Sequence, residues 1–427
     1  MLNPGVRLNR YSRLALPIAA QALLSLGQIG VTLVGSTYLS PEGWGRLAVL
    51  LSVFFVGAGF VRGFGALPVV IYLSGDPERA RAARRAAVLL TVVAVGPASV
   101  AIAIVGAGVG TAASGFSLAA ALVAYSLYDT TRSVEMSSLR YGRVLTVDAV
   151  VMVVLAGLCA VGTLPGVDAA AALPLAMFVA YGVGAAALAL LGRPTGSWSV
   201  ATFLVEYRRD IPFLAIDGVL LGTTMSAVVI VLGASTSLAA AGAFRSCATL
   251  VAGPLQMLQT GLSPIIIRSL RSRALGERSR GPRSATTPVA GTFRVRLRSL
   301  TFPVVIAASA VTAGLLWGWT ATAVEPLVTD TVHVAVLSDA APYSVVACLL
   351  ASALWTSTVF STFQRYRRSN AELTALRVIT LACSLTILVA VPSDVAVPLR
   401  LVAATAPWLV LPALHAALRW APVSRRL

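Results

Sequence analysis

Apolar stretches of about 20 residues, separated by short polar segments, occur along the whole chain. A helix needs about 20 mostly apolar residues to cross the roughly 30 Å hydrocarbon core of a bilayer. Twelve stretches meet this requirement, at 14–39, 46–73, 87–106, 116–137, 144–163, 170–191, 211–233, 238–267, 300–322, 340–363, 373–393 and 396–419. Because 57% of the residues are hydrophobic and only 11% are charged, the chain has too little polar surface to enclose a water-soluble core. The sequence therefore predicts an all-α integral membrane protein with about twelve transmembrane helices.

The basic residues, all 33 of which are arginine, predict the orientation of the chain. Short cytoplasmic loops of membrane proteins accumulate positive charge. With the N-terminus inside, 29 arginines fall in inner segments, and the outer loops contain only Arg46 and Arg400 beside several carboxylates. We therefore expect a multi-pass protein of the cytoplasmic (inner) membrane with both termini in the cytoplasm. The formal charge of +17 then has a topological explanation, and no nucleic-acid partner is needed to account for it.

Cysteine and tryptophan positions add two expectations. The cysteines all lie inside predicted spans and lack metal-ligand spacing, at Cys159, Cys247, Cys348 and Cys383. The sequence therefore predicts neither a disulfide framework nor a metal site, and it predicts no cofactor. Four tryptophans lie near span ends, where aromatic side chains anchor helices at the membrane interface, at Trp44, Trp317, Trp319 and Trp420.

Similar spacing in the two halves of the chain predicts an internal duplication. The shared landmarks are Pro17, Gly45 and Pro68 in the first half and Pro212, Gly242 and Pro264 in the second. The intervals are 28 and 23 residues in the first half and 30 and 22 in the second. Halves with an even number of spans have the same orientation and offer a cavity between them, as in one class of transporters. We therefore predict two six-helix lobes around a central cavity, at 1–192 and 211–427, with a cytoplasmic connection at 193–210 and a basic cytoplasmic loop at 268–299.

Two segments carry a family resemblance. Residues 38–48, YLSPEGWGRLA, and residues 242–255, GAFRSCATLVAGPL, resemble the loop after the first span and the eighth span of polysaccharide flippases. These flippases belong to the multidrug/oligosaccharidyl-lipid/polysaccharide exporter superfamily. The resemblance implies a two-lobed carrier of twelve to fourteen helices that moves polyprenyl-diphosphate-linked glycans outward for cell-surface polysaccharide biosynthesis. It also implies that arginines on the second and eighth spans line a cationic substrate path.

Polar residues inside spans are candidates for a substrate site, because such groups are costly in a bilayer and usually face a cavity or a partner. Arg62, about 24 Å along the second span from Arg46, can bind a diphosphate or extend to the cytoplasmic headgroups. Arg245 is the stronger candidate for the cavity, and its alternatives are a structural pair with Asp217 or extension to the membrane surface. Asp217 is a candidate for that pair or for a protonation site. Gln21, at the comparable place in the first half, is assigned to the cavity or to a hydrogen bond between helices.

Polar residues also recur every three or four positions near the inner end of the fourth span, at Tyr125, Tyr128, Asp129, Arg132 and Glu135. This spacing places them on one helix face, where opposite charges can pair. The main expectation is a solvated helix end, and the alternative is a cytoplasmic rim of the cavity that includes Asp129 and Arg132. Asp148, just inside the fifth span, is expected to pair with Arg143 or Arg140.

Other functional classes remain as alternatives to the flippase. The outer loops are short and poor in carboxylates, which disfavours a membrane glycosyltransferase or polymerase, and the GxxxxGK[ST] phosphate loop is absent. We therefore predict a carrier and not an enzyme. A major-facilitator-like transporter and a drug/cation antiporter stay open. The basic loop at 268–299 is expected to contact anionic membrane lipids, a pyrophosphate lipid headgroup, or a glycosyltransferase or polymerase of the same pathway.

Overall fold

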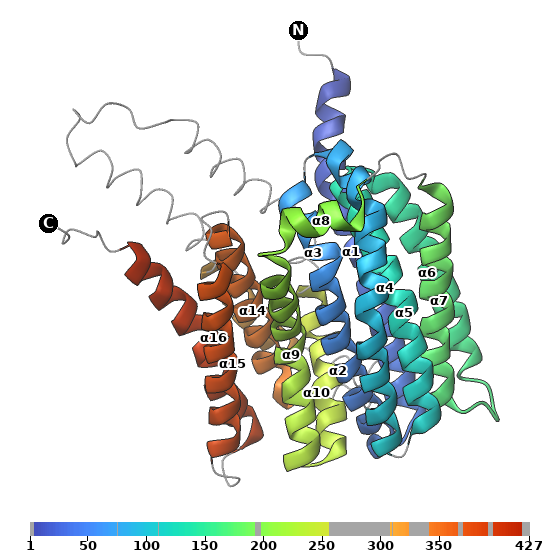
Figure 1. Ribbon diagram of the computed structural model, residues 1–427. Helices are drawn as coiled ribbons and strands as arrows, with labels where there is room; N and C mark the ends of the chain where they lie inside the picture. Colours follow the sequence, from blue (N-terminus) through green and yellow to red (C-terminus); the bar gives the residue numbers. More distant parts are fainter. Residues whose placement is uncertain are drawn as a thin grey trace, which may run out of the picture.

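The computed structural model describes residues 4–74, 76–109, 111–192, 198–255, 308–309, 311–323, 341–365, 370–391 and 396–420. Within these residues the regular structure is helical throughout, with no β-strand (Figure 1). The basic loop predicted at 268–299 lies outside the described residues, so the partners expected for it stay predictions.

Six long helices of alternating direction form the N-terminal lobe (Figure 1). They are α1 (Pro4–Tyr38), α2 (Pro41–Phe64), α4 (Pro77–Gly108), α5 (Ala112–Ser137), α6 (Tyr141–Val161) and α7 (Ala169–Leu191). Capping residues set several of their starts. The Ser40 side chain accepts a hydrogen bond from Gly43 N, and the Asp76 side chain accepts one from Arg79 N. Each cap precedes a proline, which suits the first turn because its missing N–H has no helical partner there.

The second predicted span, 46–73, is not one continuous helix. It divides at Gly65 into α2, the short α3 (Ala66–Pro68) and a π-helix, η1 (Val69–Leu73). A Cβ at Gly65 would overlap the hydroxyl of Thr91 and lie 2.8 Å from the carbonyl of Ala87, so α4 passes too close for a side chain. Pro68 has no N–H to continue the α-helical ladder. Close packing and proline together account for the break.

The C-terminal lobe is built from helices that follow a short connecting helix, α8 (Val200–Tyr207). Its described helices are α9 (Ile211–Ser235), α10 (Leu238–Leu250), α14 (Ser344–Arg365), α15 (Asn370–Ala390) and α16 (Val397–Trp420), with a 3-10 turn η2 (Ala341–Tyr343) before α14. Residues 311–323 are also helical. Figure 1 shows α8 lying across one end of the bundle. We call this the arginine-rich end because Arg79, Arg81, Arg140 and Arg143 lie there, and the sequence predicts that it is cytoplasmic.

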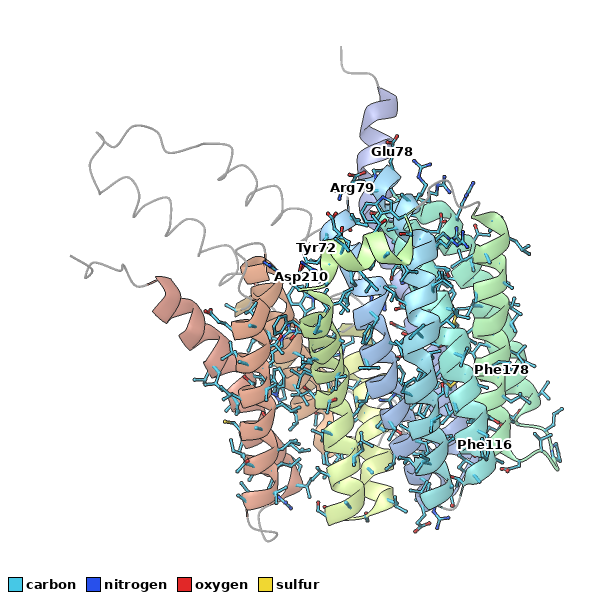
Figure 2. The ribbon with its side chains drawn as sticks, viewed as in Figure 1. Tyr72, Glu78, Arg79, Phe116, Phe178 and Asp210 are labelled. Atoms are coloured by element: carbon cyan, nitrogen blue, oxygen red, sulfur yellow. The ribbon has the colours of Figure 1, made fainter. Side chains whose placement is uncertain are left out.

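Length and apolar composition qualify six described helices as membrane spans. A bent pair within α9, Ile211–Leu220 and Thr223–Ser235, makes a seventh if the two pieces are one span. The outward faces of these helices are apolar, as lipid contact requires. Figure 2 shows Phe116 and Phe178 projecting from the outside of the N-terminal lobe, and both side chains are exposed. The described part of the chain is therefore that of a multi-pass membrane protein.

The two lobes meet where α2 packs on α9. A Cβ at Gly59 would overlap the carbonyl of Gly218, and a Cβ at Gly63 would overlap the backbone of Ala215. Small residues allow this close approach, which is a common way for helices to associate in membranes. Side chains that flank this contact on α2 therefore lie at the boundary between the lobes.

Candidate functional site

Arg245 lies at the boundary between the lobes. It is about two turns into α10, a helix that begins after Ser237, whose side chain accepts a hydrogen bond from Ala240 N. The guanidinium carbon of Arg245 lies 4.7 Å from the centroid of the Phe55 ring of α2, so the cation faces an aromatic surface of the other lobe. Its Nε is buried without a hydrogen-bond partner, and within the described residues it has no carboxylate partner. Arg245 is therefore an interior cation whose charge the described protein does not neutralise.

Arg62 lies two turns beyond Phe55 on nearly the same face of α2. Its Nε is 3.2 Å from Oδ2 of Asp129 on α5. The Arg62 side chain is 42% exposed, whereas that of Asp129 is only 10% exposed. The alternative that Arg62 only extends to the lipid headgroups does not fit this ion pair, and the sequence did not predict that Arg62 and Asp129 lie together.

Two further ion pairs are fully enclosed in the N-terminal lobe. Nε of Arg132 lies 3.1 Å from Oδ2 of Asp148. The other carboxylate oxygen of Asp148, Oδ1, accepts a hydrogen bond from the Tyr128 hydroxyl. Arg84 donates to Glu135 at 3.0 Å. These pairs tie α5 to α6 and to α4. Removing one partner from such a buried pair leaves an uncompensated charge, so we assign both pairs a structural role.

The expectation of a solvated end on α5 is wrong. Four side chains of this set are buried, because α2, α4, α6 and α7 all pack on α5: Tyr128, Asp129, Arg132 and Glu135. The charges do not pair with one another along α5 but with residues of α2, α4 and α6. The alternative rim role of Asp129 fits its contact with Arg62, whereas Arg132 is enclosed with its partner on α6.

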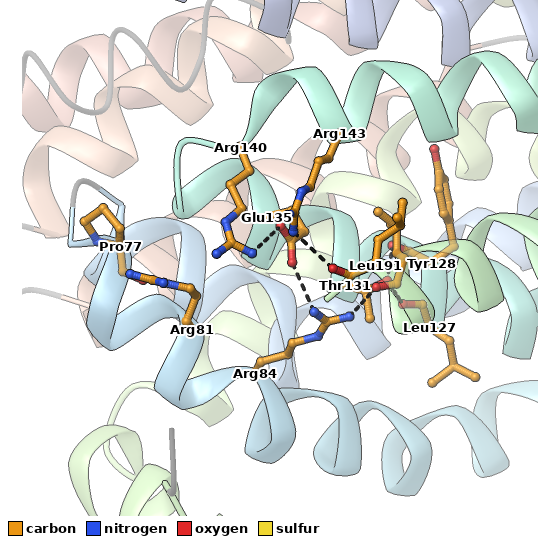
Figure 3. Close-up of polar contacts among 11 residues, drawn as sticks. Pro77, Arg81, Arg84, Leu127, Tyr128, Thr131, Glu135, Arg140, Arg143 and Leu191 are labelled. Atoms are coloured by element: carbon orange, nitrogen blue, oxygen red, sulfur yellow. Dashed lines mark hydrogen bonds and ion pairs between the residues drawn. The ribbon is translucent and has the colours of Figure 1, made fainter. Parts of the chain in front are cut away.

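The expected pairing of Asp148 with Arg143 or Arg140 is also wrong. Figure 3 shows that Arg140 approaches Glu135, at 3.6 Å, and that Arg143 donates to the carbonyl of Leu191 at 3.0 Å. Both arginines belong to the first turn of α6 or its cap, at the arginine-rich end. Asp148 lies about two turns further along α6, where its carboxylate pairs with Arg132 of α5.

Asp217 belongs to the interior of the C-terminal lobe. Its Oδ2 lies 3.1 Å from a terminal nitrogen of Arg377 on α15, and both side chains are buried. The alternative pairing of Asp217 with Arg245 is therefore wrong. Arg377 is one of the 29 arginines expected in inner segments, but it lies within α15. Arg400, expected in an outer loop, is also buried and donates to the carbonyl of Leu388. Gln21 is partly buried on α1, and its role in the cavity stays a prediction.

Trp44 is not an interfacial anchor. Its side chain is buried at the start of α2, and its Nε1 donates to the Gly242 carbonyl and to the Ser246 hydroxyl of α10, each at 3.0 Å. A Cβ at Gly35 would lie 2.5 Å from the indole ring, and one at Gly242 would lie 2.7 Å from it. The indole thus joins the lobes at the end opposite the arginine-rich end. In the sequence, Gly45 directly after Trp44 was a signal of this close packing, since a Cβ there would overlap the carbonyl of Leu238.

The arrangement favours an anionic ligand. Four interior carboxylates, those of Asp129, Glu135, Asp148 and Asp217, each pair with an arginine. Within the described residues no group of three or more His, Cys, Asp or Glu side chains is placed to hold a metal ion. The cysteines there are free thiols.

Fold and site together define a class: an all-helical, two-lobed integral membrane protein with cationic side chains at the boundary between its lobes. Solved structures with this fold include MATE transporters. An outward-facing multidrug resistance MATE family transporter of the MOP superfamily matches with a TM-score of 0.65 and 14% identity, over 96% of this chain and 94% of that chain. The inward-facing form matches at 0.61 and 14%, over 96% and 98%. The Vibrio cholerae MATE transporter, in a bent form, matches at 0.62 and 12%, over 96% and 95%.

These likenesses confirm the predicted all-α, two-lobed fold. At 12–14% identity they establish a shared fold and leave the substrate open. No protein-family model matches the sequence, and no curated protein matches it either.

Proposed function

We propose that the protein translocates a polyprenyl-diphosphate-linked glycan across the cytoplasmic membrane for cell-surface polysaccharide biosynthesis. The observation that carries this proposal is Arg245, a partly buried guanidinium at the boundary between the lobes without a carboxylate partner in the described part of the chain. A charged arginine inside a membrane protein costs several kcal/mol unless a partner compensates it. An anionic substrate is such a partner.

The diphosphate is the chemical group that suits this site. A guanidinium presents its N–H donors in a planar fork that matches two phosphate oxygens. Hydrogen bonds to charged groups contribute about 1.5–3 kcal/mol each, and the low dielectric at this depth strengthens the attraction further. Phe55 supports the cation from one side and leaves its edges for the ligand.

A cationic drug is a less suitable substrate, although two of the structures that share this fold are described as a multidrug resistance transporter. An interior carboxylate without an arginine partner would favour such a substrate, because opposite charges attract strongly at low dielectric. The four buried carboxylates of the described interior are all paired with arginines, whereas Arg245 is not paired with a carboxylate. The excess charge of this described interior is therefore positive.

Complementation of a flippase-null strain tests the proposal. We expect Arg245→Ala to abolish surface polysaccharide while the protein remains at normal abundance in the membrane. Arg245→Lys should restore polysaccharide only partly, because lysine keeps the charge but lacks the planar guanidinium that binds two phosphate oxygens. Arg46→Ala is the matched control, since Arg46 is exposed at the outer end of α2 and should be dispensable. Full activity of Arg245→Ala would contradict the proposal. Hypersensitivity of null cells to cationic drugs with normal surface polysaccharide would replace it with drug efflux.

A further inference from the structure

Three of the arginine–carboxylate pairs of the N-terminal lobe differ in how many hydrogen bonds they contain and in how exposed they are. In two of them, Arg132 with Asp148 and Arg84 with Glu135, the arginine donates hydrogen bonds to the carboxylate and both side chains are enclosed. The contact of Arg62 with Asp129 is as short, at 3.2 Å, but Nε of Arg62 makes no hydrogen bond with it. This pair is therefore held by charge alone.

The exposure of the two partners is also unequal. Asp129 is almost enclosed, whereas 42% of the Arg62 side chain is exposed. None of the hydrogen bonds in the described part of the chain involves Arg62, so its guanidinium keeps its donors for another acceptor. On α2, Arg62 lies about two turns from Phe55 on nearly the same face, and Phe55 is the residue that contacts Arg245.

Asp129 is not left without compensation if Arg62 turns away. Its carboxylate is also attracted electrostatically to Arg132, one turn further along α5. Arg132 stays hydrogen-bonded to Asp148 in either arrangement. The enclosed Arg132–Asp148 pair therefore provides a fixed polar surrounding in which Asp129 can lose its contact with Arg62 and regain it.

We propose that Asp129 is the exchangeable counter-ion of Arg62. In the empty carrier Asp129 holds the guanidinium, and an entering diphosphate takes Arg62 from it. When the substrate leaves, Asp129 binds Arg62 again, so the carboxylate limits how tightly the diphosphate is held. This inference rests on the proposed function and assigns Asp129 a part in setting substrate affinity.

Binding of farnesyl diphosphate to the purified full-length protein tests the inference, with farnesol as the uncharged reference ligand. We expect Asp129→Asn to tighten binding of the diphosphate roughly two- to fivefold, as loss of a competing, partly exposed ion pair implies. Arg62→Ala should weaken binding, and the double variant should bind as weakly as Arg62→Ala, because Asp129 acts through Arg62. The matched control is Glu206→Gln, which removes the carboxylate from an exposed pair with Arg79 and should leave binding unchanged.

Several results would overturn the inference. Unchanged or weaker binding by Asp129→Asn would do so, as would tighter binding that persists in the Arg62→Ala background. Asp129→Ser serves as a second neutral variant. Unfolding of both Asp129 variants would show that the Arg62–Asp129 pair stabilises the fold and is not exchangeable. If wild type and variants bind farnesyl diphosphate no better than farnesol, the proposed function fails together with the inference. If the wild type prefers the diphosphate and Asp129→Asn does not change its affinity, only the inference fails.

Discussion

Replacing Trp44 with phenylalanine should weaken the contact between the lobes at the end opposite the arginine-rich end. The indole N–H donates to two acceptors of α10, the Gly242 carbonyl and the Ser246 hydroxyl, each at 3.0 Å. Phenylalanine keeps an aromatic ring in the space that Gly35 provides but has no N–H. The variant therefore removes the polar link and retains most of the apolar packing.

The size of the effect follows from these hydrogen bonds. A neutral hydrogen bond contributes about 0.5–1.5 kcal/mol net, and here one proton is shared between two acceptors, so we take about 1–2 kcal/mol for the link. Since about 1.4 kcal/mol corresponds to a factor of ten in an equilibrium, the ratio of joined to separated lobes should fall roughly five- to thirtyfold in Trp44→Phe. Ser246→Ala removes one acceptor only and should cause a smaller shift.

Distance measurement between spin labels can detect this shift. Labels at Leu164 and Ser235, in a cysteine-free background, report on exposed positions of the N-terminal and C-terminal lobes at the relevant end. We expect a population with a longer distance to grow in Trp44→Phe. Trp317→Phe is the matched control, because the Trp317 indole also donates to a backbone carbonyl, that of Val251, but both residues belong to the C-terminal lobe.

The control variant should lose stability without a change in the distance distribution. If Trp44→Phe gives the wild-type distribution, or if Trp317→Phe shifts it equally, the indole does not hold the lobes together. The reasoning from its two hydrogen bonds would then be refuted.

Two further predictions concern the buried ion pairs and the topology. Asp148→Asn should lower the thermal unfolding midpoint in detergent far more than Tyr128→Phe. It takes from the buried Arg132 the carboxylate charge to which it is hydrogen-bonded, at a cost of about 3–5 kcal/mol, against about 1 kcal/mol for the lost hydroxyl. Similar midpoints for the two variants would contradict the structural role of the pair. A cysteine at Ser199, at the arginine-rich end, should react with an impermeant reagent only after the cells are opened, and one at Leu164 should react in intact cells; the reverse pattern would refute the predicted orientation.

The sequence alone singles out Arg62 and Arg245, because the free-energy cost of a charge inside the membrane can be inferred from its position in an apolar stretch. A charge inside an apolar stretch is unfavourable wherever the helix packs, so both residues could be singled out from the chain alone. Their partners were not predictable in the same way. Arg62 pairs with Asp129 on α5, and Arg245 lies over Phe55 instead of beside Asp217.

Asp148 and Trp44 show why such partners were missed. Neighbouring arginines in sequence, Arg140 and Arg143, were the natural expectation for Asp148, yet the rotation of α6 turns its carboxylate toward α5. Trp44 occupies a position near a span end, where tryptophan usually contacts the lipid interface, but here the other lobe covers it. Neither rotation nor coverage is encoded in local composition.

The sequence by itself determined the class of the fold, most of the spans and a predicted orientation, because hydrophobicity, helix length and charge asymmetry act through each segment's own contact with lipid and water. Only the tertiary structure decided which charges are neutralised and which side chains join the lobes. Those outcomes depend on the close approach of α2 to α9 and α10, where glycines leave space for the neighbouring backbone and for the Trp44 indole. They also depend on which helices, far apart in the chain, face one another. Such contacts arise from the packing of whole helices, and no single segment specifies them.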